Sequence, residues 1–542
     1  MKPYLNKVSG KSNSDIVTFS GGLNVCQDKS FIKDNQMSYM WNVCLSQSPT
    51  LKTRSDRTSI AWFMSDRTNY ATGKILKILA TTSKEIYTIE EFNEENSRIF
   101  RYKSVGRSAL QKVYIATIPV SNAYYMCECR DANKQYIVIS TLSKRIVYTV
   151  GADGVVTAED DVRGILAFHK NRLWIANGTS LKFSKLREYD DFTINSEDTE
   201  NTAGEINVTN AKGNITAIKP YDGKLIIFCE RSRHMLYGSS PNSEIDQFSL
   251  IDFDDDIGCI SDESITICDR QLYWVDSNMS VYRYNGASTI NIAEPYGSDN
   301  YASYGGIKGL QIDTTNLKNI AMSNYDTYIY IALKKSIEAG NENDTIFVYD
   351  TKNRVWWAED GAFSHLEKWE TDTKTPFYNT ADYIIGSKYN GDILILNALT
   401  GTGTDCIFNT TTRLFEDQNI KYEFETKTWN LGTIKETKTL TNIWFQADAN
   451  AKVGVCDYWE EYNPWDNLLN GIDDNFLVLG KLGKVDFSHN VQKPSMTRYQ
   501  GKERQRFIVP KMYMQKINAF SIKVKGEGEG KFHLMQKEWR IK

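Results

Sequence analysis

Residues Ser264–Asn291 read SITICDRQLYWVDSNMSVYRYNGASTIN and contain three short runs of β-branched and aromatic residues. A polar cluster follows each run: Asp269-Arg270, then Asp276-Ser277-Asn278, then Asn285-Gly286. β-Branched and aromatic residues favour strands, whereas Asp, Asn, Ser and Gly favour tight turns. The stretch therefore predicts a meander of antiparallel strands joined by hairpins.

The same alternation of strand and turn recurs along the middle of the chain. The second strands of the late copies contain Leu225, Leu272, Tyr328 and Ile384, at intervals of roughly 45–55 residues, the length of one four-stranded propeller blade. Helical periodicity is nearly absent from this region. We therefore predict an all-β chain in which residues 61–415 form a β-propeller of about six or seven blades.

The region before the propeller has few periodic runs. Residues 1–60 predict an extended N-terminal arm. Within it, Met37, Met40 and Trp41 are spaced three and four residues apart, which predicts a short amphipathic helix over Ile32–Asn42.

The region after the propeller has a different pattern. Residues 416–542 contain strictly alternating runs such as Lys421–Trp429, which predict a C-terminal β-sandwich-like domain with one solvated face. The sequence Gly526–Gly530 predicts a turn between two of its strands. Asp457–Asn475 is an aromatic and acidic loop, and loops of this length are usually functional or interaction surfaces.

Composition limits the classes of function. The 542 residues are 41% hydrophobic and 12% aromatic, which is enough for more than one core. The net charge of −4 argues against a basic nucleic-acid-binding surface. The sequence contains neither an apolar run that could span a bilayer nor an apolar signal segment at its start, so we expect assembly in a cytoplasm, no membrane insertion and reduced thiols at the 9 Cys.

The sequence contains no convincing catalytic constellation. The five His are scattered, and neither an HExxH motif, a GxSxG elbow nor a P-loop is present, so we expect no enzyme activity and no cofactor. Asp254, Asp255 and Asp256 are weak candidates for a Ca²⁺ site, because their spacing differs from that of an EF-hand and fits a solvated loop equally.

Several phrases, taken in their order, resemble the tail hub, nozzle or packaged-DNA stabilisation proteins of short-tailed bacteriophages. These phrases are Phe19-Ser20-Gly21-Gly22-Leu23-Asn24, Asp34-Asn35-Gln36-Met37, Trp41-Asn42-Val43, Leu51-Lys52-Thr53-Arg54 and the mid-propeller run from Gly258 to Gly286. The resemblance covers about residues 19–290. The chain departs from the family pattern at Ser55-Asp56, where Pro-Gly is usual, and at Met279-Ser280, where a Gly is usual.

The resemblance implies a structural virion protein of the viral tail, assembled in the host cytoplasm. It implies a homo-oligomeric ring, most simply a hexamer, that extends the DNA channel below the portal and adaptor rings, retains packaged DNA, serves DNA ejection and docks tail fibres or spikes. Double-stranded DNA would pass through the lumen without sequence-specific contact. The residues that it suggests for assembly contacts, together with three aromatic residues of the long loop, are Gly21, Gly22, Asn24, Trp41, Arg54, Tyr458, Trp459 and Trp465.

One alternative belongs to a different class, a propeller that binds or cleaves carbohydrate and interacts with a receptor. Aromatic platforms beside carboxylates would support it, and Tyr458-Trp459-Glu460-Glu461 is the nearest such sequence.

Overall fold

The computed structural model describes the chain from residue 12 to residue 541. The positions that it leaves undescribed within this range are 26, 106–108, 132–133, 152–154, 159–161, 244–245, 254–255, 294–313, 336–339, 371–381, 399–401, 431–437, 458–471, 474–475, 483–495, 500–501, 509–514 and 518.

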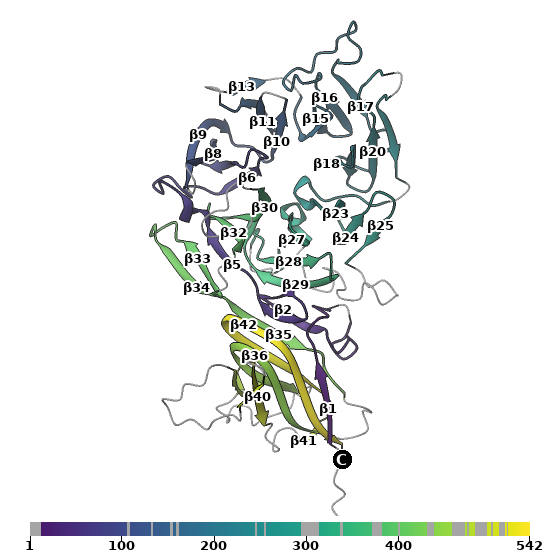
Figure 1. The fold of residues 1–542 in the computed structure, drawn as a ribbon. Coiled ribbons are helices and arrows are strands. Elements are labelled where there is room, and N and C mark those ends of the chain that lie inside the picture. The colour runs from purple at the N-terminus through teal and green to yellow at the C-terminus, as the bar shows by residue number, and fades with distance from the viewer. Residues whose placement is uncertain are drawn as a thin grey trace, which may run out of the picture.

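The upper part of the molecule is a seven-bladed β-propeller, so the predicted fold is confirmed (Figure 1). Six blades are four-stranded antiparallel sheets built from consecutive strands. They are β6 (Ile75–Ala80), β7 (Ile86–Glu91), β8 (Asn96–Val105), β9 (Ala109–Pro119); β10 (Tyr124–Arg130), β11 (Gln135–Thr141), β12 (Arg145–Thr149), β13 (Val155–Ala158); β14 (Ile165–His169), β15 (Arg172–Asn177), β16 (Ser180–Phe183), β17 (Gly204–Asn207); β18 (Ile215–Tyr221), β19 (Lys224–Cys229), β20 (Arg233–Tyr237), β21 (Ser249–Asp252); β22 (Ile265–Cys268), β23 (Gln271–Val275), β24 (Val281–Tyr284), β25 (Thr289–Asn291); β26 (Ala321–Tyr325), β27 (Tyr328–Leu333), β28 (Thr345–Asp350) and β29 (Val355–Asp360).

The seventh blade closes the ring with a strand from the N-terminal region. Its strands β30 (Phe363–Glu370), β31 (Asp382–Lys388) and β32 (Ile393–Ala398) are followed in the sheet by β5 (Asp56–Ser59), then β33 (Thr404–Phe408) and β34 (Phe415–Asn419). β5 pairs antiparallel with β32, and the innermost strand β30 contacts β6 of the first blade. The two ends of the propeller are therefore joined within one sheet.

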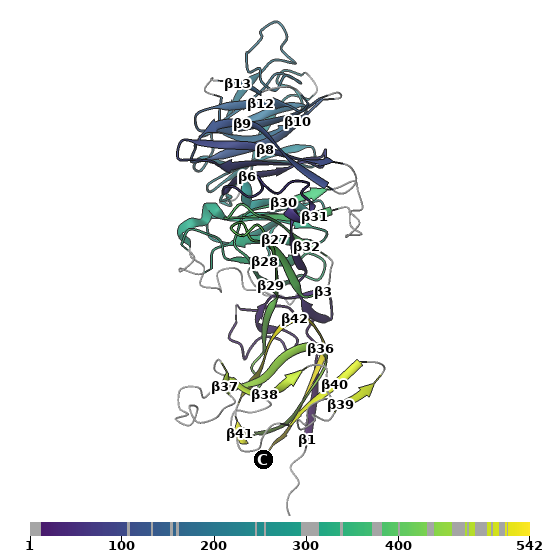
Figure 2. The same ribbon diagram turned by 90° about the vertical axis from the view of Figure 1, so that its left-hand side faces the viewer.

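Below the propeller lies a twelve-stranded sheet built around two long strands (Figure 2). β36 (Lys438–Asp457) and β42 (Phe520–Ile541) pair antiparallel along almost their whole length. The remaining strands are β1 (Ser12–Val17), β2 (Met37–Trp41), β3 (Val43–Gln47), β4 (Thr50–Thr53), β35 (Lys421–Thr426), β37 (Ile472–Asp473), β38 (Phe476–Leu482), β39 (Met496–Tyr499), β40 (Lys502–Ile508) and β41 (Gln515–Ile517). We call this domain the lower sheet.

Residues 12–59, predicted as part of an arm, contribute the strands β1 to β5 to the two domains. β1 pairs with β42, β2 pairs with β35, and β5 belongs to the seventh blade. The arm prediction does not hold for this range, because the apolar residues that looked isolated in the sequence complete sheets formed by the end of the chain.

Two local predictions are wrong for identifiable reasons. The predicted helix over Ile32–Asn42 is instead a loop followed by the strand β2. A bulge between Met37 and Tyr39 lets Met37 and Met40 both face the core, which imitates helical spacing. The predicted turn at Gly526–Gly530 lies inside the continuous strand β42, where the register shifts against β36. A Cβ at Gly526 would approach the Tyr422 ring to 2.4 Å, so glycine permits this close packing.

One hydrophobic core extends from the sixth blade into the lower sheet. It includes Trp356 of β29 together with Phe424 of β35 and Phe532 of β42. Phe19 packs edge-on against Phe424 with ring centroids 5.6 Å apart, and the Leu23 amide donates to the Trp356 carbonyl. The two domains therefore share their interior.

Candidate functional site

Three of the residues that the family resemblance suggests as assembly contacts lie at the junction between the propeller and the lower sheet. Gly22 has a φ of +69°, and a Cβ there would approach Val355 Cβ to 2.9 Å. Gly21 donates its amide to the Asn35 carbonyl, and the buried Asn24 donates its side-chain amide to Gln36 Oε1 at 3.0 Å. In this fold these residues hold the entry loop against the sixth blade.

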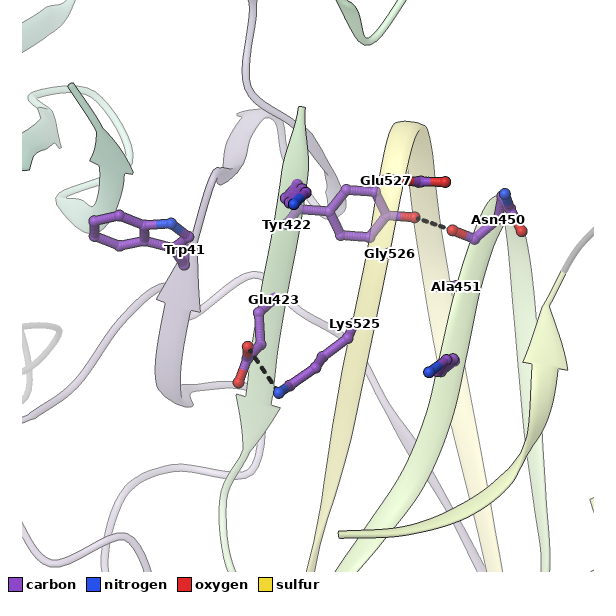
Figure 3. Close-up of a pocket in the computed structure, with 10 residues that line it drawn as sticks. Trp41, Tyr422, Glu423, Asn450, Ala451, Lys525, Gly526 and Glu527 are labelled. Carbon is purple, nitrogen blue, oxygen red and sulfur yellow. Dashed lines mark hydrogen bonds and ion pairs between the residues drawn. The ribbon is translucent and has the colours of Figure 1, made fainter. Parts of the chain in front are cut away.

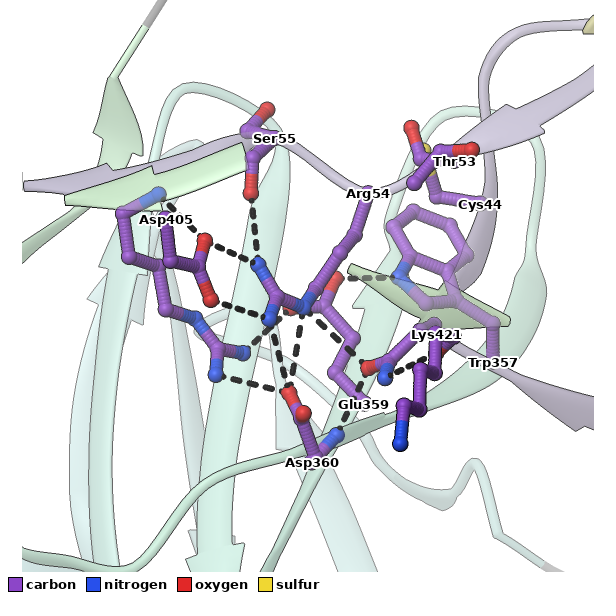
Figure 4. Close-up of polar contacts among 11 residues, drawn as sticks. Cys44, Thr53, Arg54, Ser55, Trp357, Glu359, Asp360, Asp405 and Lys421 are labelled. Carbon is purple, nitrogen blue, oxygen red and sulfur yellow. Dashed lines mark hydrogen bonds and ion pairs between the residues drawn. The ribbon is translucent and has the colours of Figure 1, made fainter. Parts of the chain in front are cut away.

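Arg54 is the centre of a buried ionic network at the same junction (Figure 4). Its guanidinium donates to both carboxylate oxygens of Asp405, at 2.9 and 2.7 Å, and contacts Asp360 Oδ1 at 3.0 Å. Burial by itself would lower the pKa of Arg54, but Asp360 and Asp405 outweigh it and raise that pKa above its usual value. The side chain of Arg54 is 1% exposed, so its charge is held entirely by these partners.

Arg57 and Asn42 extend this network across the junction. Arg57 donates to Asp360 Oδ1 at 2.9 Å and to Glu359 Oε2 at 3.0 Å. Asn42 accepts from Arg54 and from the Asp360 amide, and donates to the Lys421 carbonyl at 2.7 Å. We name Asn42, Arg54, Arg57, Glu359, Asp360 and Asp405 the junction network. It ties blade strands β29, β33 and β5 to strand β35 of the lower sheet.

A second charged cluster crosses the centre of the propeller. Lys77 on β6 lies 2.9 Å from Asp262 Oδ2 and 2.5 Å from Glu263 Oε1, in the short helix that precedes β22. His365 Nδ1 on β30 lies 3.3 Å from the same Glu263 oxygen. These contacts join the first, fifth and seventh blades across the axis.

Glu367 lies on β30 two residues after His365. Burial raises the pKa of the Glu367 carboxyl to about 7, with Lys219 and Lys77 opposing the shift and Glu263 adding to it. Glu263 shows the opposite behaviour, because Lys77 and His365 outweigh its burial and lower its pKa well below the usual range. The propeller centre thus combines one carboxylate fixed in its charged form with one that titrates near neutral pH.

The fourth blade also brings together a serine, a histidine and an aspartate. Ser232 Oγ lies 3.1 Å from His234 Nε2, and His234 Nδ1 lies 2.6 Å from Asp252 Oδ1. This is the order of contacts in a hydrolase triad. Ser232 is, however, 4% exposed, and its hydroxyl accepts the Lys212 amide at 2.9 Å. The three residues therefore serve as an internal brace of the fourth blade.

Most of the other predicted site residues lie outside the part of the chain that the structure describes. Asp256 is exposed and pairs with Lys212, while Asp254 and Asp255 lie outside the described residues. Tyr458, Trp459 and Trp465 also lie outside them. Within the described part of the chain, no group of three or more His, Cys, Asp or Glu is placed to hold a metal ion, and no helix is long and apolar enough to cross a membrane.

Two of the N-terminal candidates line surface hollows, Trp41 the first (Figure 3) and Asn24 the second. The first hollow has a volume of about 480 Å³ and lies over strands β2, β35, β42 and β36. The second hollow, of about 540 Å³, adjoins it, and Glu423 lines both. We call the two hollows together the lower groove. Sequence reasoning missed it, because its residues come from five segments of the chain.

Comparison with known proteins identifies no family. No protein-family model and no characterised protein sequence matches the chain.

Solved structures with a similar arrangement include the extracellular domain of the one-component system BT4673 from B. thetaiotaomicron, at 11% identity and a TM-score of 0.37. That alignment covers 88% of this chain and 63% of the other, so the chain spans less than two thirds of its length. The β-propeller domain of Myceliophteria thermophila Cps50 (Swd1) aligns with 61% of this chain over 98% of its own, at 9% identity and a TM-score of 0.37. YCF48 from Cyanidioschyzon merolae aligns with 60% over 95% of its own, at 8% identity and a TM-score of 0.32. Matches at this level carry no information on function.

Proposed function

We propose that the chain is a structural subunit of the tail hub or nozzle of a short-tailed bacteriophage. The ordered phrases between Phe19 and Arg54 and between Gly258 and Gly286 support this proposal. The observation that carries it is the junction network, because the N-terminal residues of these phrases bind a propeller and a second β domain into one body with a shared core. Such a body suits a mechanical part that transmits load without changing shape.

The ion pairs at the propeller centre limit where DNA could pass. The ion pairs of Lys77 with Asp262 and Glu263 cross the propeller axis, so a single subunit offers no duplex-sized passage along that axis. A DNA channel would instead be enclosed by several subunits around a common axis, as in a closed hexameric ring with head-to-tail contacts. A net charge of −4 suits a lumen that lets DNA slide without the tight binding that dense Lys and Arg would cause.

The contacts to neighbouring proteins must come from parts other than the N-terminal strands. Residues 12–59 are committed to the two sheets of their own subunit. Portal or adaptor rings and fibres or spikes would therefore dock on outer loops and blade rims.

The test is quantitative mass spectrometry of DNA-filled particles purified from the source culture. We expect the chain in every preparation at about half the copy number of the portal subunit, the ratio of a hexamer beneath a dodecameric portal. Absence from purified particles would refute the proposal. Presence at a few copies per particle would refute the ring while leaving a virion role.

A further inference from the structure

Strand β9 is the outer edge of the first blade, and it is unusually long for that position (Figure 1). It has 11 residues, whereas the outer strands of the second to fifth blades, β13, β17, β21 and β25, have 3 or 4 residues each. Within the described part of the chain, no strand pairs with the outer side of β9, apart from a single parallel bridge of Met64 to Leu110 at its start. The backbone of residues 111–119 therefore presents a row of open hydrogen-bonding groups at the rim of the propeller.

This edge lacks the charges that usually keep an exposed strand from pairing. Lys112 is the one charged residue of β9, and its ammonium group lies 2.7 Å from Glu90 in a buried ion pair. Residues 113–118, Val-Tyr-Ile-Ala-Thr-Ile, are uncharged, and five of the six are β-branched or aromatic. The outer strand of the seventh blade, β34, differs in this respect, because it contains two acidic residues. A long, uncharged edge strand pairs readily with another strand.

A bulge near the middle of β9 arranges its exposed side chains. The register between β8 and β9 skips Ile115. Tyr114 and Thr117 are both exposed, and their hydroxyl groups lie 2.8 Å apart. These two residues are therefore the side chains of the edge that a pairing strand would meet first.

Exposed apolar side chains gather along the same rim. Tyr114 is 53% exposed, and Val105 at one end of the β8–β9 hairpin and Val120 at the other end are also exposed. Leu142 of the second blade lies beside Val120, because its amide donates to the neighbouring Ser121 Oγ at 3.2 Å. Exposed apolar groups that gather on one surface mark a contact with another protein.

We infer that β9 pairs antiparallel with β9 of a second copy of this chain. With the middles of the two strands aligned about a two-fold axis, Tyr114 of each copy lies near Thr117 of the other, and aromatic and β-branched residues are favourable cross-strand neighbours. Lys112 of each copy then lies near Pro119 of the other, so no like charges face one another. Each copy satisfies the open backbone groups of the other and covers part of its apolar rim.

The pairing concerns the free chain and is independent of the tail proposal. A head-to-tail ring contains no two-fold contact, so the pair would open before such a ring closes. A strand of a different protein could use the same backbone row, and the purified chain alone would then remain a monomer.

The test is sedimentation velocity of the purified full-length chain between about 1 and 100 µM. We expect a concentration-dependent species of twice the 62.0 kDa chain mass, with a Kd below about 50 µM. Thr117→Glu should weaken the pairing by about tenfold or more, because it places a carboxylate in the middle of the uncharged edge. Within its own subunit the new carboxylate would face Arg98 of β8, an opposite charge that the fold tolerates.

Val156→Glu is the matched control, because Val156 is 57% exposed on β13, the outer strand of the second blade. It should leave the Kd unchanged. A monomer at every concentration, or equal weakening by the two substitutions, would overturn the inference. If Thr117→Glu unfolds, hydrogen exchange of the wild-type protein decides: peptides from β9 should gain protection as the concentration rises and peptides from β13 should not, and a dimer without protection of β9 would overturn the inference.

Discussion

At the scale of single residues, Arg54 is a charged side chain that is almost fully buried, with 1% of it exposed. Removing one partner of a buried ion pair leaves a charge that the interior cannot solvate. We expect Asp405→Asn to lower the free energy of unfolding by about 3 kcal/mol, since Asp360 still holds part of the charge. Urea denaturation followed by tryptophan fluorescence measures this loss.

Asp256→Asn is the control for that experiment. Asp256 forms an exposed ion pair with Lys212, and exposed pairs contribute little because water and salt screen them. Its unfolding midpoint should equal that of the wild type. A loss for Asp405→Asn as small as for Asp256→Asn would show that the junction network does not hold the two domains.

The buried Glu367 carboxyl should make the stability of the protein depend on pH. Burial raises the pKa of its carboxyl to about 7, whereas the unfolded chain has the lower, ordinary value, so the folded state binds the proton more tightly. Its contribution to stability is therefore present at low pH and is lost as the pH rises through about 7. Glu367→Gln should lose less stability than the wild type between about pH 5 and pH 7 in urea titrations.

Glu370→Gln supplies the comparison on the same strand. Glu370 is exposed and its hydrogen bond with Lys368 lowers the pKa of its carboxyl, so it stays charged throughout this pH window. That variant should follow the wild-type pH dependence. If Glu367→Gln also follows it, the buried Glu367 carboxyl does not set the pH dependence of stability.

The sequence predicted Arg54 as a notable residue but not its role. Its partner Asp405 lies 351 positions away, and no local pattern joins the two. The same holds for the lower groove, whose facing residues Trp41, Glu423, Lys525 and Lys452 become neighbours only through the register of four strands. The sequence shows which residue types are present. Which of these residues become neighbours depends on how distant strands pair in the folded chain.

At the scale of elements, the blade strands followed from the sequence because local forces determine them. The predicted recurrence of strands and turns is confirmed by blade strands such as β10, β14 and β27. The hairpin turns at Asp222-Gly223 and Asp269-Arg270 have positive φ at both positions, as tight hairpin turns require. The predictions for β2 and β42 were wrong because both strands contain register shifts. An extra residue in one strand changes the face on which the following side chains lie.

The strand β1 provides a direct test against the predicted arm. Val17 and Ile16 are neighbours on β1, but Val17 is 2% exposed in the shared core and Ile16 is 62% exposed. We expect Val17→Asp to cost about 3 kcal/mol or more in unfolding free energy, because it buries an unpaired charge, and Ile16→Asp to cost little. Chemical denaturation of both variants measures the difference. Equal, small effects would mean that residues 12–17 behave as a detachable arm.

At the scale of the whole molecule, the sequence indicated a propeller but left the blade number open. The reason is the seventh blade, in which β5 from the N-terminal region fills a place between β32 and β33. Repeats in a sequence reveal only blades made of consecutive strands. They do not reveal a blade that is completed by a strand more than 300 positions away. The same N-terminal segment then supplies β1, β2 and β4 to the lower sheet, so neither domain is complete without residues 12–59.

This sharing predicts that the propeller and the lower sheet open together. Core residues of β29, β35 and β42 belong to one cluster, and the junction network ties β29 and β33 to the N-terminal strands. In hydrogen-exchange mass spectrometry at rising urea concentration, peptides from β29 and β42 should lose protection at the same concentration, as parts of one cooperative unit do. In Asp405→Asn the two should separate, with the lower sheet opening first because it has lost its ionic tie to the seventh blade. Separate opening in the wild type would mean that the shared core and the junction network do not couple the unfolding of the two domains.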